Sequence, residues 1–260
     1  MIAAGIDMGT QSVKVAILKD GKILSKGKAF CGFKPKDAAE EAFEEALTNS
    51  KLSRDEIRHV TATGAGVDLV SHFDSTISMM GADAQAGVYF FPSARTVVDI
   101  GAEDARAVSC DERGTMLDFV VNSRCAAGAG TFIEAMARAL EVKLEEMGPL
   151  SIKAEEATPI NASCVIFAES DVVSLIHRQK SKEKIARAIY AALADRVSSM
   201  MHRLGIKQEV VLVGGVAEDV GFIAALERTL GMNILIPEDP VFAGAVGAAL
   251  TASKRIEKVK

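Results

Sequence analysis

The fold is decided by residues 7–21, which read DMGTQSVKVAILKDG, and by residues 99–114, which read DIGAEDARAVSCDERG. Each segment follows a short apolar stretch, opens with Asp-x-Gly and has a basic residue seven positions after its Asp, Lys14 or Arg106. This pattern predicts a strand, a tight turn and a β-hairpin, made twice along the chain. The duplication predicts two related lobes that face each other across a cleft and hold a polyphosphate with its metal.

The Asp-x-Gly turns suit phosphate and magnesium. Backbone amides of a tight turn form a concave anion site, and glycine lets the ligand approach closely. A carboxylate at the end of a strand can hold Mg²⁺, which prefers oxygen ligands. Asp7 and Asp99 are therefore the predicted magnesium ligands and, with Glu103, the candidate catalytic residues. The predicted nucleotide-binding residues of these turns are Gly9, Thr10, Gln11, Ser12 and Lys14 in the first and Gly101 and Ala102 in the second.

A third element is the predicted strand Glu209–Val213, whose apolar run begins at Val210 and leads through Gly214-Gly215-Val216 toward a predicted helix, Asp219–Leu230. Its bare backbone suits an adenosine, so Gly214, Gly215 and Val216 complete the predicted nucleotide site. The same joint is common in α/β proteins and is weak evidence alone. The chain has neither the P-loop sequence nor a Gly-x-Gly-x-x-Gly fingerprint, so those two nucleotide sites are unsupported.

Composition restricts the remaining possibilities. The 260 residues are 49% hydrophobic and 25% charged, as in an ordered α/β protein. A net charge of −5 and the lack of Trp argue against nucleic-acid binding. No apolar run approaches a membrane span, and the N-terminus reads as a strand rather than a signal peptide. We expect a cytoplasmic protein with one lobe at 1–92 plus 243–260 and the other at 93–242.

Further elements follow from hydrophobic periodicity and turn signals. Strands are expected at Ile2–Ile6, Ser12–Leu18, Lys22–Phe30, Ile57–Thr63 and Ile234–Ile236, with a hairpin turn at Asp20-Gly21. Helices are expected at Lys36–Thr48, Asp83–Tyr89, Thr131–Leu140, Phe167–His177, Lys182–Leu204 (with Gly205 as its stop) and Phe242–Ser253. The last is rich in Gly and Ala and should pack closely on a neighbour.

Two of the four cysteines precede predicted helices. Cys125 stands before Thr131–Leu140, and Cys164 stands before Phe167–His177. A helix N-terminus lowers a thiol pKa and stabilises a thiolate-bound cluster. Two such cysteines cannot supply the four thiolates of a [4Fe–4S] cluster, but two copies of the chain related by a twofold axis can. The alternative is that both are small core residues, which is also our prediction for Cys31 and Cys110.

Taken together, these motifs resemble a known family. It comprises the ATP-dependent activators of 2-hydroxyacyl-CoA dehydratases and the ATPase subunits of benzoyl-CoA reductase, of BadF/BadG/BcrA/BcrD type, with an actin/hexokinase/Hsp70-like fold. The resemblance covers nearly the whole chain, and the two cysteine motifs set it apart from other ATPases of that fold. It is carried, in order, by residues 5–10 (GIDMGT), 99–101 (DIG), 125–130 (CAAGAG), Cys164 with 167–170 (FAES), 214–216 (GGV) and 243–249 (AGAVGAA).

The resemblance implies an α/β, two-lobed ATPase with duplicated mixed-sheet domains and helices packed on them. It implies a homodimer, or a heterodimer with a paralogous subunit, in which Cys125 and Cys164 of each subunit bind one [4Fe–4S] cluster. ATP, hydrolysed to ADP with Mg²⁺, would drive a low-potential electron from ferredoxin or flavodoxin to an acyl-CoA dehydratase or reductase in an anaerobic cytoplasm.

Some residues depart from the dehydratase-activator pattern. Ala102-Glu103-Asp104 stands in place of Gly-Gln-Asp, Ala65-Gly66-Val67 in place of Tyr-Gly-Arg, and Asp83 where a His is usual. These changes favour the benzoyl-CoA reductase type of subunit. Two other functions stay open: a small-molecule kinase with Asp99 or Asp104 as base, and a nucleotide-binding regulatory protein whose cysteines only pack.

Overall fold

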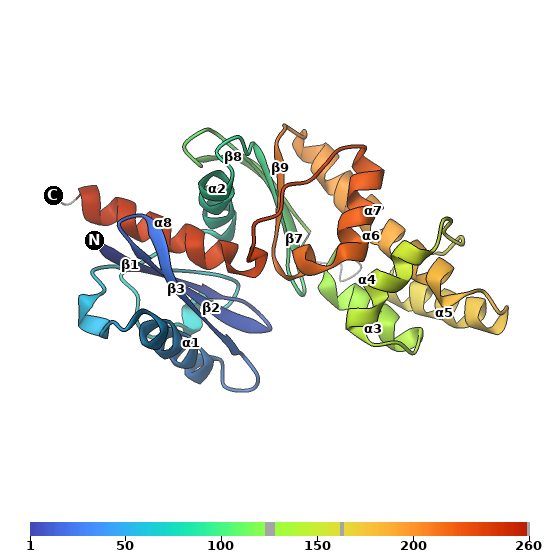
Figure 1. The fold of residues 1–260 in the computed structure, drawn as a ribbon, viewed down its shortest axis with the longest axis horizontal. Coiled ribbons are helices and arrows are strands. Elements are labelled where there is room, and N and C mark those ends of the chain that lie inside the picture. The colour runs from blue at the N-terminus through green and yellow to red at the C-terminus, as the bar shows by residue number, and fades with distance from the viewer. Residues whose placement is uncertain (123–127, 162–163, 259–260) are drawn as a thin grey trace. The chain divides into compact units, whose positions relative to one another are not determined.

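The computed structural model describes residues 1–122, 128–161 and 164–258. The chain packs as two compact units (Figure 1). The first comprises Met1–Val97, Val108–Asp118 and Pro237–Lys260, and the second comprises Val98–Ala107 and Phe119–Ile236. The lobe boundaries expected at residues 92 and 243 remain our proposal.

The first unit is built on a five-stranded mixed sheet. Its strands are β1 (Ile2–Met8), β2 (Ser12–Lys19), β3 (Lys22–Phe30), β4 (Val60–Thr63) and β5 (Ser75–Thr76), in the order β3-β2-β1-β4-β5. The β1–β2 and β2–β3 pairs are antiparallel, whereas β1 pairs with β4 in parallel. The predicted hairpin turn is confirmed, because Asp20 and Gly21 both have positive φ, 51° and 76°, as a type I′ turn requires.

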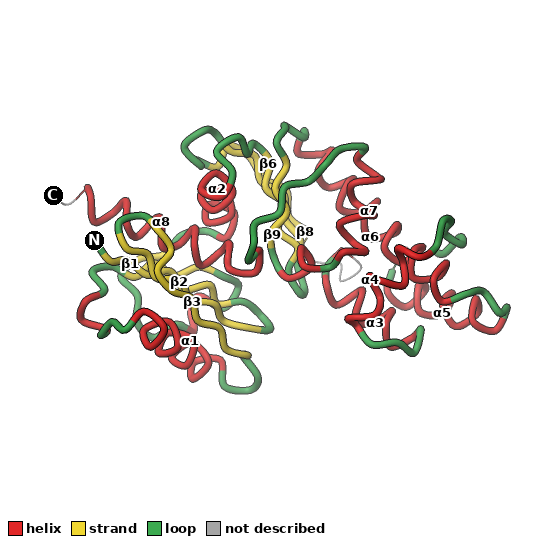
Figure 2. Tube along the Cα trace, viewed as in Figure 1, coloured by secondary structure: helices red, strands yellow, loops and turns green. Residues whose placement is uncertain are grey.

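Helices cover both faces of this sheet (Figure 2). Val13, Val15 and Ile17 of β2 share a core with α1 (Pro35–Ser50), while the intervening Ala16 and Leu18 pack with α8 (Ala243–Lys258). Alternate side chains of a strand point to opposite faces, so β2 is buried on both. Helix α2 (Met79–Phe90) packs against α8.

The close packing expected of the last helix is confirmed at Gly5. A methyl group at this position of β1 would lie 2.1 Å from the Ala245 carbonyl oxygen and 2.3 Å from the Ala249 nitrogen. The strand and the helix backbone are therefore nearly in contact, which only small residues permit.

A second sheet has the order β8-β7-β6-β9. It consists of β6 (Thr96–Ile100), β7 (Ala105–Cys110), β8 (Met116–Asn122) and β9 (Val210–Val213). The expected strand Ile234–Ile236 is reduced to one parallel bridge between Val211 and Leu235. The second Asp-x-Gly turn joins β6 to β7, as the duplication predicts.

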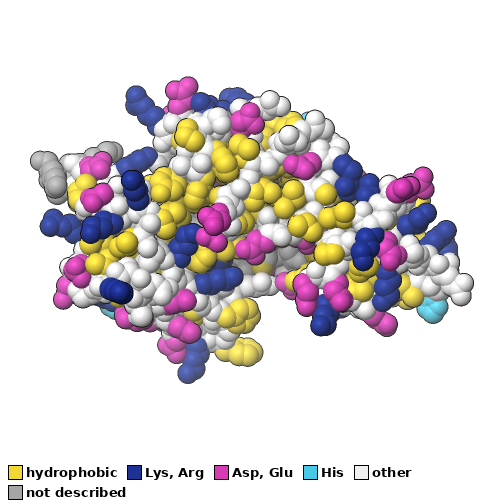
Figure 3. All heavy atoms as spheres, in the orientation of Figure 1, with side chains coloured by type: hydrophobic (Ala, Val, Ile, Leu, Met, Phe, Trp, Pro, Cys, Tyr) yellow, Lys and Arg dark blue, Asp and Glu magenta, His cyan; other side chains and the backbone are white. Residues whose placement is uncertain are grey.

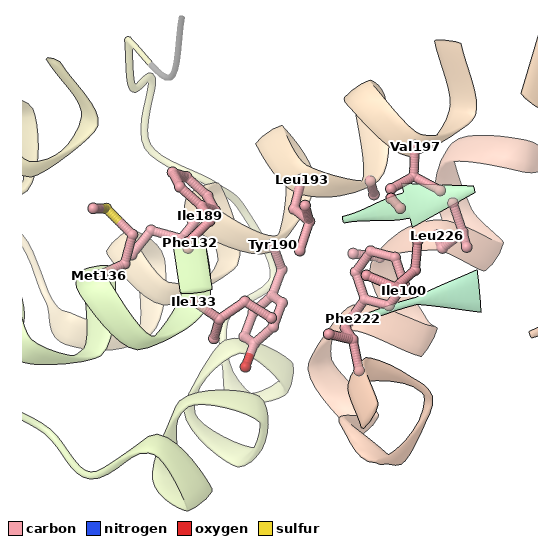
Figure 4. Close-up of a cluster of buried hydrophobic side chains, with 14 of the residues drawn as sticks. Ile100, Phe132, Ile133, Met136, Ile189, Tyr190, Leu193, Val197, Phe222 and Leu226 are labelled. Carbon is pink, nitrogen blue, oxygen red and sulfur yellow. The ribbon is translucent and has the colours of Figure 1, made fainter. Parts of the chain in front are cut away.

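Five helices complete the second unit: α3 (Gly130–Ala139), α4 (Leu144–Lys153), α5 (Val165–His177), α6 (Lys182–Leu204) and α7 (Val220–Leu230). Their common core joins side chains of α3, α6 and α7 with those of β6 (Figure 4). In that view Phe132 and Met136 of α3 lie beside Ile189 of α6, and Phe222 and Leu226 of α7 lie beside Ile100. The expected stop of α6 is confirmed, since Gly205 has a φ of 82°.

Two differences from the predicted helices have local causes. Helix α4 was not expected, because Gly148-Pro149 interrupts its pattern; in the structure Gly148 packs tightly against Asp219 and Gly221. Helix α2 begins at Met79 instead of Asp83, because the Ser78 hydroxyl accepts a hydrogen bond from the Gly81 amide and caps the helix.

The surface carries both signs of charge. Acidic and basic side chains are interspersed over the face shown in Figure 3, in keeping with the small net charge. Within the described part of the chain, none of the helices combines the length and hydrophobicity that a membrane crossing needs.

Candidate nucleotide-binding site

The segment Gly9–Ser12, which is predicted to bind phosphate and is called the first phosphate loop below, connects β1 to the start of β2. Asp7 is the penultimate residue of β1 and stands directly opposite Lys14 in the β1–β2 pair. The Lys14 Nζ lies 3.9 Å from Asp7 Oδ2 and donates a hydrogen bond of 3.3 Å to the Ser12 carbonyl oxygen. The seven-residue spacing thus brings a cation to the carboxylate and to the loop backbone.

The Asp7 carboxylate also lies against the first turn of α8. A methyl group at Gly244 would be 3.0 Å from Asp7 Oδ2. A helix N-terminus stabilises negative charge, so α8 supports an ionised Asp7. Thr10 and Gln11 of the loop are exposed to solvent, where a phosphate could reach them.

Cys31 is buried, as predicted, yet it also contacts this loop. It follows β3, and its thiol donates a hydrogen bond to the Gly9 carbonyl oxygen at 3.2 Å. Its backbone amide donates to the Gln11 carbonyl oxygen at 3.0 Å. Burial raises the pKa of the Cys31 thiol, so the group is a protonated donor at neutral pH.

The second predicted phosphate loop, residues 101–104, joins β6 to β7. A buried ion pair holds it in place. Arg106 of β7 donates to Asp99 Oδ2 through Nη2, and through Nη1 to Asp104 Oδ2 at 3.0 Å. The Asp99 and Arg106 side chains are each only 8% exposed. Glu103 is exposed at the tip of the turn. The same seven-residue spacing therefore produces an Asp–cation pair in both loops.

At Gly214 the predicted adenosine segment lies against the end of β6, directly before the second loop. Its φ of 87° and ψ of 179° belong to a region that is almost restricted to glycine. A methyl group at Gly214 would lie 2.2 Å from Asp99 Oδ1 and 2.5 Å from the Ile100 carbonyl oxygen. Gly215, by contrast, is exposed and has open space where its Cβ would be.

Helix α3 begins on the second loop. The Gly130 amide donates to the Gly101 carbonyl oxygen and the Thr131 amide donates to the Ala102 carbonyl oxygen, both at 2.9 Å. In a planar trans peptide the C=O and N–H groups point in opposite directions. Holding these two carbonyls on α3 thus turns the amides of Ala102 and Glu103 away from the helix.

Cys164 is the N-cap residue of α5, which confirms its predicted place at a helix start. Ile166 and Phe167, two and three residues after Cys164, are 72% and 58% exposed, which is unusual for large apolar side chains. Cys125, the other predicted cluster ligand, lies outside the described residues. Among the residues that are described, no three His, Cys, Asp or Glu side chains form a metal-binding group.

The sequence profile of the BadF/BadG/BcrA/BcrD ATPase family matches residues 4–252, which include both loops and both cysteines. The chain belongs to this family. Among its relatives, the activator of lactoyl-CoA dehydratase from Anaerotignum propionicum is 36% identical and aligns over 99% of this chain and 100% of its own length. A subunit of benzoyl-CoA reductase from Thauera aromatica is 33% identical over 99% of this chain and 95% of its own length. The sequence identities thus do not support the expectation that the chain is closer to the benzoyl-CoA reductase type of subunit than to the dehydratase activators.

Solved structures of family members superimpose closely. The component A of (R)-2-hydroxyglutaryl-CoA dehydratase from Acidaminococcus fermentans matches with a TM-score of 0.94 at 33% identity, over 99% of both chains. The activator of 2-hydroxyisocaproyl-CoA dehydratase from Clostridium difficile, with bound ADPNP, gives 0.92 at 34% identity, over 100% of this chain and 97% of its own. A glucokinase of the ROK family shares the fold alone, at 14% identity and a TM-score of 0.61. The predicted fold class is confirmed.

The sequence did not reveal three groups that contact the two predicted phosphate loops: the Arg106 side chain, the Cys31 thiol and the amides that begin α3. Arg106 was visible from its spacing, which equals that of Lys14, but was not placed in the site. The Cys31 thiol and the amides that begin α3 gave no local signal, because their loop contacts depend on strand pairing and helix packing.

Proposed function

We propose that this chain is an ATP-dependent activator that passes a low-potential electron from a [4Fe–4S] cluster, shared by two chains, to a CoA-thioester dehydratase or reductase. The observation that carries the proposal is Cys164 at the start of α5, beside exposed apolar side chains, in a chain whose relatives are named as activators of CoA dehydratases. The cluster supplies one-electron redox chemistry at low potential.

The phosphate loops supply the nucleotide chemistry. Amides of Thr10 and Ser12 in the first loop, and of Ala102 and Glu103 in the second, bind the phosphates of ATP. Gly214, Gly215 and Val216 contact the adenosine. The Clostridium difficile activator was solved with ADPNP, a nucleotide of this class, which supports the assignment.

Asp7 is the stronger of the two predicted magnesium ligands. Its cationic neighbour, Lys14, is 3.9 Å away, whereas Asp99 Oδ2 is bonded to the guanidinium of Arg106 inside the fold. A carboxylate already engaged by Arg is a poorer direct ligand for a cation, and Mg²⁺ is usually held by one or two carboxylates together with water and phosphate. Asp99 then acts mainly by fixing Arg106 and the second loop.

Helix α3 links the nucleotide to the cysteine motif. Its first two amides bond to the second phosphate loop, and Cys125 precedes Gly130 by five residues. A change at the γ-phosphate that moves Gly101 or Ala102 would therefore shift the start of α3. If ATP binds more tightly to the chain with α3 in one position than in the other, nucleotide binding shifts the helix and so couples the nucleotide to the redox site.

The cluster requires a second chain. Cys125 and Cys164 provide two thiolates, and a [4Fe–4S] cluster takes four. Ile166 and Phe167, next to Cys164, would be covered by the partner subunit, a paralogue or a second copy of this chain, which removes apolar surface from water. Ferredoxin or flavodoxin would supply the electron, and an acyl-CoA dehydratase or reductase would accept it.

Replacement of either cysteine tests the cluster. We expect the anaerobically purified protein to be brown with about four irons per dimer, and Cys164→Ser or Cys125→Ser to be colourless. Both variants should still bind ADPNP, because neither residue belongs to the phosphate loops. Iron analysis, the visible spectrum and calorimetric titration measure this.

Cys110→Ser is the matched control, since Cys110 is a buried free cysteine on β7, and we expect it to retain iron. A colourless, iron-free wild-type dimer that binds ADPNP would contradict the proposal and favour a nucleotide-binding regulatory protein. The kinase alternative gains no support from the geometry, because Arg106 engages both candidate bases, Asp99 and Asp104.

Asp7→Asn tests the magnesium site. We expect Mg-ATP turnover to fall by roughly 10- to 100-fold, since the metal loses a charged ligand that helps to neutralise the phosphates, while iron content stays at the wild-type value. Asp37→Asn is the control, because Asp37 also faces a lysine, Lys34, at 3.8 Å but on an exposed part of α1. Loss of iron in Asp7→Asn would instead indicate a folding role.

A further inference from the structure

The first phosphate loop has three carbonyl groups that each accept a hydrogen bond from a fixed donor. The Cys31 thiol donates to Gly9, the Cys31 amide donates to Gln11, and the Lys14 ammonium donates to Ser12, at 3.2, 3.0 and 3.3 Å. Two of these three donors belong to one residue. Cys31 is 6% exposed, so it is held in place by the core.

The two bonds from Cys31 set the direction of two peptide groups. A trans peptide points its N–H away from its C=O. With the Gly9 and Gln11 carbonyls turned toward Cys31, the amides of Thr10 and Ser12 point away from it. Backbone amides that are turned outward in a tight turn form the type of concavity that binds phosphate.

Strand pairing accounts for only one of these bonds. Ser12 stands opposite Phe30 in the β2–β3 pair, and the bond from the Cys31 amide to Gln11 continues that pairing by one residue. The Gly9 carbonyl lies beyond the paired strands, and the Cys31 thiol is the donor that fixes it. A side chain without a donor at position 31 would leave this peptide group without that contact.

We infer that Cys31 is a positioning residue for phosphate binding: its thiol orients the Gly9–Thr10 peptide so that the Thr10 amide faces the nucleotide. This inference rests on the proposed nucleotide site. Cys31 does not touch the phosphate and undergoes no covalent change. It acts by reducing the freedom of the loop before the ligand binds, which strengthens binding by preorganisation.

The test measures the Kd for Mg-ADPNP by calorimetric titration in three variants of Cys31 and in one control variant of Cys110. Cys31→Ala and Cys31→Val remove the donor, and we expect the Kd to rise about fivefold, as for the loss of one weak hydrogen bond. Cys31→Ser keeps a donor and should restore the Kd to within about twofold of the wild type. Val is close to Cys in size, which separates the hydrogen bond from packing.

Cys110→Ala is the matched control. The Cys110 thiol is also buried, also has its pKa raised by burial, and donates to a backbone carbonyl, that of Ala94 at 3.7 Å, away from any phosphate loop. Its Kd should equal that of the wild type. Wild-type affinity in Cys31→Val, or an equal loss in Cys110→Ala, would overturn the inference. Failure of the wild type to bind Mg-ADPNP would instead overturn the proposed nucleotide site.

Discussion

We expect Gly214→Ala to weaken nucleotide binding by more than about 100-fold and to destabilise the protein by roughly 2–6 kcal/mol. The backbone at Gly214 has φ and ψ of 87° and 179°, a conformation that costs a residue with a Cβ about 1–3 kcal/mol. The new methyl group would also lie 2.2 Å from Asp99 Oδ1 and 2.5 Å from the Ile100 carbonyl oxygen. Relief of such overlap typically costs a further ~1–3 kcal/mol.

The atoms that would have to move belong to the end of β6, directly before the second phosphate loop. Asp99 is held by Arg106, and Ile100 is fully buried in the core, so neither yields easily. The strain would be relieved by displacement of Gly214 and the adenosine segment from β6. A displacement that raises the binding free energy by about 3 kcal/mol weakens the Kd by more than 100-fold.

Gly215→Ala provides the matched comparison. This neighbouring glycine has an ordinary φ and no atom within 4 Å of the position of a Cβ. We expect its midpoint of urea unfolding to equal that of the wild type, because the added methyl group meets no protein atom. If Gly214→Ala unfolded at the same urea concentration as the wild type and bound ADPNP with the same Kd, the conclusion that Gly214 packs closely against Asp99 would be contradicted.

The sequence predicted what depends on local pattern. The Asp-x-Gly turns, the Asp20-Gly21 hairpin and the position of Cys164 shortly before a helix follow from residues within a few positions of one another, although that helix begins at Val165 and not at the predicted Phe167. Helix α4 was missed because Gly148-Pro149 is a local stop signal, which packing against α6 and α7 overrides. Propensity is a weak guide where tertiary contacts supply the stability.

In the candidate site, too, local sequence spacing predicts some residues, whereas other contacts depend on the tertiary structure. Lys14 was assigned to the site from the sequence, and the duplicated spacing would have assigned Arg106 in the same way. The contact between the Cys31 thiol and Gly9 requires the β2–β3 register, and the approach of Gly214 to Asp99 requires β9 to lie beside β6. A one-residue slip in register would turn each strand's side chains to the other face, so such contacts are beyond sequence pattern alone.

Arg106→Met should destabilise the second unit by about 3–5 kcal/mol, the usual cost of removing one partner from a buried ion pair. Met fills much of the arginine volume, so the loss comes from leaving the Asp99 carboxylate buried without its cation, with Asp104 affected less because it is 25% exposed. Urea unfolding measures the change. Because the second phosphate loop is built around this pair, ADPNP binding should weaken as well.

Arg54→Met is the control that shows whether the stability loss in Arg106→Met comes from burial of the ion pair or from the number of carboxylates that the arginine binds. Arg54 also bonds two carboxylates, Glu40 at 2.6 Å and Glu44 at 2.9 Å, but its side chain is 38% exposed. Exposed ion pairs contribute about 0–1 kcal/mol, and the Arg54 guanidinium lies 4.5 Å from the centre of the Phe43 ring, a contact worth about 0.5–1 kcal/mol. We therefore expect a loss of about 1 kcal/mol and unchanged ADPNP binding. Equal losses in the two variants would show that Asp99 reaches water, and that its ion pair with Arg106 does not hold the second phosphate loop in place.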